Sequence, residues 1–198
     1  MGTGVSRVAY GAGKDLLIEA AITVVAERGL RGLTYRAVGE EAGVNNTLVA
    51  HHFGNRDALL AAALESSTRR AIQTTRLLIF SSSEEEFIQA LLSTLKGESA
   101  MHSFQYEMIL EAKRNPAFLP AVSQSYVEYL DAMKEGLRSF GIEHDLTTVA
   151  RVTFAALDGL VLQYMAGIDE QSIIEGIRRV WQNLADQRTS TEEPVSKN

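Results

Sequence analysis

The polar side chains best suited to recognising another molecule are crowded into one stretch, the ten residues VNNTLVAHHF that begin at Val44. Asparagine can pair with the edge of an adenine through two hydrogen bonds, and threonine and histidine can bond bases or phosphates. A helix over this stretch can turn its apolar residues inward, namely Val44, either Leu48 or Val49, and Phe53. The polar residues then left to face outward are Asn45, Asn46, Thr47 and His51. This pattern favours recognition of a DNA groove.

The stretch is the second of two short predicted helices that are joined by a tight turn. The hydroxyl of Thr34 can cap a first helix over residues 35–42, which Gly43 closes. After the turn, either Asn45 or Asn46 can cap the second helix. Two short helices joined by a glycine turn predict a helix-turn-helix, the motif that places its second helix in the major groove of DNA.

Seven further helices are predicted from apolar residues that recur three and four positions apart. No run of alternating apolar and polar residues predicts a strand, so we expect an all-α fold of about nine helices. The side chains expected to cap helices are Asn55, Ser83, Asn115, Asp145 and Asp169. The further helices are expected at about residues 14–28, 56–79, 84–96, 99–114, 116–140, 146–166 and 170–187.

These helices divide into two predicted domains and a tail. Residues 1–58 contain an N-terminal arm and the three-helix helix-turn-helix domain, and residues 59–188 form a larger helical domain. The polar segment 189–198 is expected to be disordered. The helix over 56–79, about 35 Å long at 1.5 Å per residue, can connect the two domains.

Composition excludes several classes of protein. The chain has no cysteine, which excludes disulfides, thiolate metal sites and cysteine nucleophiles. We find neither a signal sequence nor a run of about 18–20 apolar residues, so we expect a cytoplasmic protein that does not enter a membrane. The net charge of −6 argues against nonspecific coating of nucleic acid. However, the first 60 residues hold six basic and six acidic side chains, so the excess negative charge lies beyond them.

The sequence offers little for metal binding or catalysis. His51 and His52 are adjacent on a helix and point about 100° apart, so they cannot chelate one ion. No Glu-x-x-His motif occurs, and no nucleophile, base and orienting group come together. We therefore expect no metal, no cofactor and no enzymatic activity.

The residues from Thr34 to Leu64, TYRAVGEEAGVNNTLVAHHFGNRDALLAAAL, resemble the signature of the TetR family of bacterial transcriptional regulators. The chain departs from that signature at three positions. Gly39 stands where relatives have alanine, Ala50 where many have a phosphate-binding tyrosine, and Arg56 where lysine is customary. The matching positions are Thr34, Ala42, Gly43, Val44, His52, Phe53, Arg56 and Leu59.

The resemblance implies a homodimer that binds a palindromic double-stranded operator and acts as a repressor released by a small-molecule effector. The implied contacts with DNA come from Thr34, Tyr35, Arg36, Asn45, Asn46, Thr47, His51, His52 and Arg56. The implied effector pocket is lined by Phe87, Met101, Phe104, Gln105, Met108, Tyr126, Tyr129, Phe154 and Tyr164. The last two helices either pack inside one chain or form a four-helix dimer interface through Val149, Val152, Ala156, Leu160, Ile173, Ile177, Val180, Trp181 and Leu184.

Two alternatives stay open on the sequence alone. The first is a small-molecule-binding helical protein whose DNA-binding domain is weak or vestigial, because Ala50 removes a customary phosphate contact. The second is a helical enzyme, for which the sequence supplies no recognisable catalytic set. Measurement of DNA binding would separate the first alternative from a regulator.

Overall fold

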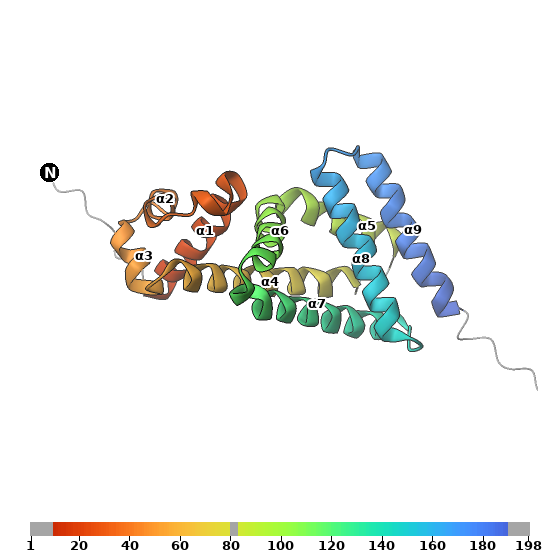
Figure 1. The fold of residues 1–198 in the computed structure, drawn as a ribbon. Helices are drawn as coiled ribbons and strands as arrows, with labels where there is room; N and C mark the ends of the chain where they lie inside the picture. Colours follow the sequence, from red (N-terminus) through yellow and green to blue (C-terminus); the bar gives the residue numbers. More distant parts are fainter. Residues whose placement is uncertain (1–9, 80–82, 190–198) are drawn as a thin grey trace, which may run out of the picture. The chain divides into compact units, whose positions relative to one another are not determined.

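The computed structural model describes residues 10–79 and 83–189, and every regular element in these ranges is helical (Figure 1). This confirms the expected all-α fold class. The elements are α1 (Tyr10–Gly32), α2 (Tyr35–Glu41), α3 (Asn46–Phe53), α4 (Arg56–Ile79), α5 (Glu84–Gly97), α6 (Ser99–Arg114), the 3-10 helix η1 (Pro116–Phe118), α7 (Leu119–Phe140), α8 (Leu146–Met165) and α9 (Glu170–Thr189). The predicted tail from residue 190 onward lies outside the described residues.

Local capping explains where most of these helices begin. Four of the five predicted caps accept a hydrogen bond from a backbone N–H two or three residues further on. The acceptor–donor distances are 2.8 Å for Asn55, 3.3 Å for Ser83, 3.3 Å for Asn115 and 3.0 Å for Asp169. The prediction for Asp145 is wrong, because its backbone is left-handed (φ 47°) and its side chain makes no capping bond.

The first helix differs from its prediction at both ends. α1 begins at Tyr10 rather than near residue 14, and it continues to Gly32 across a break at Gly29. Gly29 has φ 66° and ψ 174°, so the regular helix ends close to Arg28, as the glycine signal predicts. The last turn after the break turns the chain towards α2.

The chain packs as two compact units. The first unit contains residues up to Ser67 together with Ala100–Val122, and the second contains Thr68–Ser99 and the residues from Ser123 onward. Helix α4 therefore contributes to both units, while most of α6 belongs to the first. The functional division at residue 58 stays a prediction.

Burial of apolar stripes forms the core of the first unit. Leu17, Ala21 and Val25 of α1 are inaccessible to solvent, and so are Leu59 and Leu60 of α4. Helix α6 is buried through Phe104 and Met108. Burying a side chain of this size stabilises the fold by about 1.5–3 kcal/mol. The helix-turn-helix is thus anchored on α1 and the first half of α4.

Helices α5 and α9 are joined in the second unit by apolar packing and two ion pairs. Lys96 Nζ lies 2.7 Å from Glu170 Oε2, and Arg178 Nε lies 2.9 Å from Glu84 Oε1. The hydrogen bond that Lys96 donates to Glu170 raises the pKa of Lys96 above its ordinary value. Phe87 of α5 is buried and lies 5.2 Å from the ring of Trp181 on α9. These contacts fix α9 against α5 within one chain.

Helix α8 is unusually apolar and poorly covered. Its 20 residues include an 18-residue window of mean hydropathy 1.2, of which 22% is buried within the chain. By length and composition alone this helix could cross a bilayer, but polar residues interrupt it, so it is not the continuous apolar run of about 18–20 residues that the sequence analysis looked for. An apolar helix of this kind is also found where another protein surface covers it. Helix α8 carries two charged residues, Arg151 and Asp158.

Candidate nucleic-acid interface

The helix-turn-helix is built by local hydrogen bonds that the sequence encodes. Thr34 Oγ1 accepts a bond from Ala37 N at 3.1 Å and so begins α2. Gly43 closes α2 with φ 66°, a left-handed conformation that glycine adopts without a steric penalty. Asn45 then begins α3, since its Oδ1 accepts from Thr47 N at 2.9 Å. Asn45 is therefore the cap, which settles the choice between Asn45 and Asn46.

Helix α3 has one buried side and one polar side. Val49 has no exposed surface and packs into the core of the first unit, to which α3 belongs. Leu48 is half-buried. The exposed residues of α3 and its cap are Asn45, Asn46, Thr47, Ala50 and His51. The hydroxyl of Thr47 donates to Asn45 Oδ1 at 2.9 Å, so these two side chains hold each other in place. The polar side offers amide, hydroxyl and imidazole groups, which are the groups that bond base edges and phosphates.

Gly39 allows α2 and α3 to approach closely. A Cβ at this position would lie 3.0 Å from the carbonyl oxygen of Val44 and 3.1 Å from the backbone nitrogen of Asn46. Both neighbours are backbone atoms at the start of α3, so they cannot rotate away as a side chain could. Glycine in place of the alanine of relatives thus sets the spacing of the two helices.

At the start of α2, Tyr35 has a structural role and Arg36 faces the solvent. The hydroxyl of Tyr35 donates to the carbonyl of Gly54 at 3.0 Å and so connects the start of α2 to the end of α3. Arg36 is 83% exposed and pairs with Glu40, with Nε 2.7 Å from Oε1. The hydrogen bond and charge of Glu40 raise the pKa of Arg36 above its ordinary value. Arg36 is therefore a solvent-facing cation in the first turn of α2.

Two predicted DNA contacts lie differently from the expectation. His52 is half-buried, and its Nε2 lies 3.7 Å from where a Cβ of Gly13 on α1 would stand, so its contact with DNA stays a prediction. Arg56 Nη2 donates to the carbonyl of Leu30 at 2.7 Å. Its guanidinium thus connects the start of α4 to the last turn of α1.

The nine predicted effector-pocket residues are divided between the two units. Met101, Phe104, Gln105 and Met108 belong to the first unit, and the other five belong to the second. Phe87 lines an apolar cavity of about 10 Å³ with residues that include Met133 and Trp181. That volume is near the minimum for one water molecule and far below the roughly 300 Å³ of the smallest usual ligand pockets. The cavity that Phe87 lines is therefore too small for a usual ligand, and the effector pocket stays a prediction.

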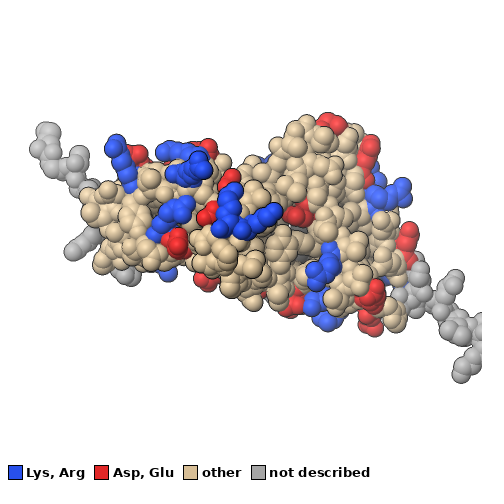
Figure 2. All heavy atoms as spheres, viewed as in Figure 1, with Lys and Arg blue, Asp and Glu red and all other residues tan. Residues whose placement is uncertain are grey.

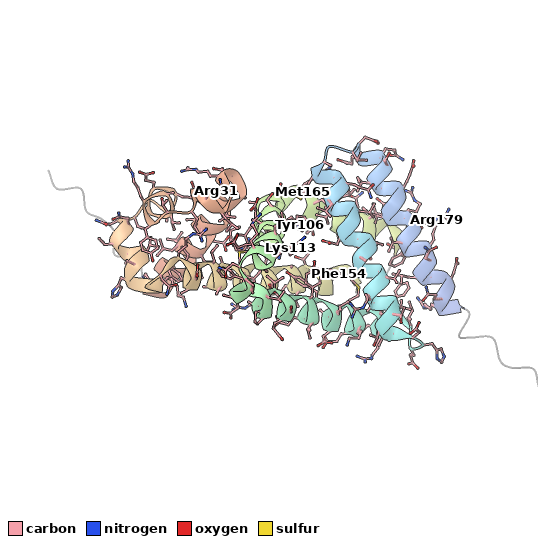
Figure 3. All side chains as sticks on the ribbon, viewed as in Figure 1. Arg31, Tyr106, Lys113, Phe154, Met165 and Arg179 are labelled. Carbon is pink, nitrogen blue, oxygen red and sulfur yellow. The ribbon has the colours of Figure 1, made fainter. Side chains whose placement is uncertain are left out.

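An aromatic cluster gathers three of these residues in the second unit. The rings of Tyr129 and Phe154 stack at 5.5 Å, and Tyr126 lies 5.8 Å from Phe154 in an edge-on arrangement. Phe154 projects from α8 (Figure 3). Burial raises the pKa of Tyr129 to about 12, and the negative charge of Asp158 adds to the shift. The cluster thus keeps neutral phenols beside apolar rings.

The predicted dimer residues fall into two groups. One group is buried within the chain, so the prediction is wrong for it, and the other keeps exposed surface. Ile173 and Ile177 are fully buried within the chain and Leu184 nearly so, and Trp181 packs between Phe87 and Phe140. Ile173 and Ile177 therefore belong to the core and cannot contact a partner. The predicted residues that keep exposed surface are Val149, Val152, Ala156, Leu160 and Val180. Most of these five line a groove of about 210 Å³ between α8 and α9, together with Asn183 and Gln187.

The residues that the structure describes contain no group of side chains suited to hold a metal ion. Within residues 10–79 and 83–189, no three His, Asp or Glu side chains are grouped so that they could hold an ion. The first unit does contain a feature that sequence analysis missed, a cleft of about 640 Å³ lined by arginines of α1, α4 and α6. No local sequence signal marks it, because its residues are far apart in the chain.

Comparison with known proteins agrees with the geometry in both parts of the chain. Residues 17–63 match the family model described as bacterial regulatory proteins, tetR family. Residues 82–187 match the model described as the C-terminal domain of tetracyclin repressor-like proteins.

Individual relatives resemble the chain over different lengths. The HTH-type transcriptional regulator BetI of Paraburkholderia xenovorans is 34% identical over 59 residues, which is 30% of each protein. A TetR-family member from Streptomyces coelicolor is 28% identical, with a TM-score of 0.64 over 85% of this chain and 97% of that structure. The multidrug binding protein EbrR, complexed with proflavin, is 27% identical, with a TM-score of 0.53 over 85% of this chain and 99% of that one. The chain thus matches under a third of the curated relative's length and nearly all of the two solved structures.

Proposed function

Because this chain belongs to the TetR family, we propose that it is a DNA-binding transcriptional regulator that responds to a small-molecule ligand. The family consists of regulators rather than enzymes. The observation that carries the proposal is the outward-facing polar side of α3, which buried Val49 holds in place. A short helix of this kind fits the major groove, where Asn46 can bond an adenine edge. Such a protein acts in the cytoplasm, where the chromosome lies.

We propose that the exposed apolar face of α8 pairs with the same face of a second copy. Val152 is 63% exposed and Ala156 lies one turn further along, beside the groove between α8 and α9. Small residues let helices approach closely. A two-fold dimer presents two copies of α3, which must lie about 34 Å apart to enter successive major grooves of a palindrome.

The ligand response is proposed from the family and from the second unit. The structure of the multidrug binding protein EbrR is that of a complex with proflavin. Here the aromatic cluster of Tyr126, Tyr129 and Phe154 supplies flat apolar surfaces with phenol groups at their edges. A ligand that favours a different α3 spacing needs a coupling energy of only about 1–3 kcal/mol to release DNA. We therefore propose a repressor that its ligand releases from the operator.

Fluorescence anisotropy with labelled DNA from the region upstream of its own gene tests the proposal. Asn46→Ala should change the preferred sequence, at a cost of about 1–3 kcal/mol for the best site. Arg36→Ala should weaken binding to all sequences alike and reduce the salt dependence, as expected for a lost phosphate contact. Arg56 is a poorer choice, because its substitution also removes the bond to Leu30.

Arg138→Ala is the matched control, since Arg138 is an exposed arginine near the end of α7. We expect it to bind like the wild type. Equal operator affinity for Asn46→Ala and the wild type would remove α3 as the helix that reads bases. If the wild type bound no DNA yet still bound small molecules, the alternative of a vestigial DNA-binding domain, which the exposed Ala50 makes possible, would replace this proposal.

A further inference from the structure

The first unit contains a wide cleft whose walls carry mainly positive charge. It has a volume of about 640 Å³, within the range of roughly 300–1,000 Å³ that small-molecule sites occupy. Its walls are the last turn of α1, the start of α4 and the second half of α6. Figure 3 labels Arg31 at the end of α1 and Lys113 on α6. The charged residues that line the cleft are Arg28, Arg31, Arg56, Glu107, Glu111 and Arg114.

The charges in the cleft do not cancel. Four guanidinium groups face two carboxylates, which leaves a formal excess of two positive charges. Arg114 Nε lies 3.4 Å from Glu111 Oε2, so this pair is already balanced. Arg28 and Arg31 are exposed and form no ion pair within the part of the chain that the structure describes. Figure 2 shows basic side chains at the surface of α1 and α6 on the face that it presents.

One of the four arginines is held in position by the fold. Arg56 Nη2 donates to the carbonyl of Leu30 at 2.7 Å, and Nη1 lies 3.9 Å from Asp57 Oδ1. Guanidinium has five donors in a planar fork, so these contacts leave donors available for a ligand. A pre-positioned arginine loses less side-chain entropy when it binds a carboxylate or phosphate.

We propose that this cleft binds a small molecule with two negative charges, either a dicarboxylate or a phosphate monoester. The excess of two positive charges matches such a ligand, and arginine binds both kinds of group through paired hydrogen bonds. The ligand joins arginines of α1 and α4 to Arg114 of α6. The site is formed by residues of the first unit alone, and its test does not depend on DNA binding.

Isothermal titration calorimetry on the full-length protein without DNA tests this site. The probes are succinate and glycerol phosphate, with acetate at matched ionic strength as the monovalent comparison. We expect at least one dianion to bind and acetate not to bind. The Arg31→Gln/Arg114→Gln double variant should bind that dianion at least tenfold more weakly. Glu107→Gln, which adds one unit of positive charge to the cleft, should bind it more tightly.

The matched control is the Lys113→Gln/Arg138→Gln double variant, which loses the same total charge at positions that do not line the cleft. It should bind within twofold of the wild type, and circular dichroism and Tm should show that all variants fold. Absence of binding by both dianions overturns the proposal. Equal weakening in the two double variants also overturns it, because general charge attraction would then suffice. If the cleft variant instead lost DNA affinity for all sequences and the wild type ignored both probes, the arginines would be phosphate contacts.

Discussion

At the scale of single residues, the second unit buries polar side chains in mutual contact. Thr68 Oγ1 donates to Ser125 Oγ at 2.9 Å, and both residues are buried. Tyr129 is also hydrogen-bonded with Thr68, which partly opposes the effect of burial on its pKa. Buried hydroxyl groups need such partners, because an unsatisfied one costs about 1–3 kcal/mol. The position of Tyr129 therefore has a consequence for stability at alkaline pH.

Tyr129→Phe should make the protein less sensitive to alkaline pH. The folded pKa of Tyr129 is about 12, above the ordinary value of 10, so the folded state binds more protons between these values. Stability from this group is complete below pH 10 and is lost as pH rises towards 12. Urea unfolding at pH 8 and pH 11 should show the wild type losing about 1.4 kcal/mol more than Tyr129→Phe. Equal losses in both proteins would place Tyr129 in a solvated environment.

Residue-level prediction from the sequence succeeds where the deciding contact is local. The outward position of Asn46 follows from helix periodicity alone, whereas periodicity left the inward position open between Leu48 and Val49, of which Val49 is the buried one. Asp145 fails, because its left-handed backbone turns the side chain away from the N–H groups that it was expected to cap. The cleft that contains Arg31 and Arg114 could not be predicted from the sequence. These two residues are far apart in the chain, and local sequence patterns do not indicate which distant residues come together.

At the scale of elements, helix starts are well predicted because a cap acts within one turn. Asn55 separates the reading helix α3 from the long α4, and its side chain begins α4. The packing of a helix is harder to predict. The apolar stripe of α9 is visible in the sequence, but the pattern does not say whether α5 or a second chain covers it. The burial of Ile173 and Ile177 within the chain shows that α5 and its neighbours do so.

Asn55→Ala should destabilise the protein by about 1 kcal/mol, because Ala58 N loses its hydrogen-bond acceptor at the start of α4. Asn55→Ser retains an acceptor at the same position and is the matched control. The free energy of unfolding from urea titration measures both changes. A Ser variant as unstable as the Ala variant would show that the side chain of Asn55 acts by something other than capping.

At the scale of the whole molecule, the apolar face of α8 is the clearest sign of assembly. An isolated chain would leave Val152, Leu162 and Met165 in water, with 39–63% of each residue exposed. Val152 lines the groove between α8 and α9 together with Val149 and Ala156, and an exposed apolar patch of this kind marks an interaction site. Sequence analysis identified α8 as part of an interface only through the family resemblance, because an apolar helix is equally compatible with a buried core.

Val152→Glu should convert a dimer into a monomer, because a carboxylate at the centre of an apolar interface loses its hydration without gaining a partner. Val127→Glu is the matched control, since Val127 is an exposed valine on α7, with 50% of its surface accessible. Sedimentation equilibrium should give a dimer for the control and a monomer for Val152→Glu. The monomer should also lose operator affinity, because binding through two linked α3 helices is lost. A dimeric Val152→Glu protein would move the interface elsewhere.

The discontinuous first unit also affects how the protein is made. Its helices come from two stretches of chain, with residues 68–99 of the other unit between them. A ribosome releases the chain from the N-terminus, so α1 to α4 emerge before α6 exists to supply Phe104 and Met108. The first unit can therefore complete its core only after synthesis has passed residue 122. More than half of the protein must be translated before this unit is whole.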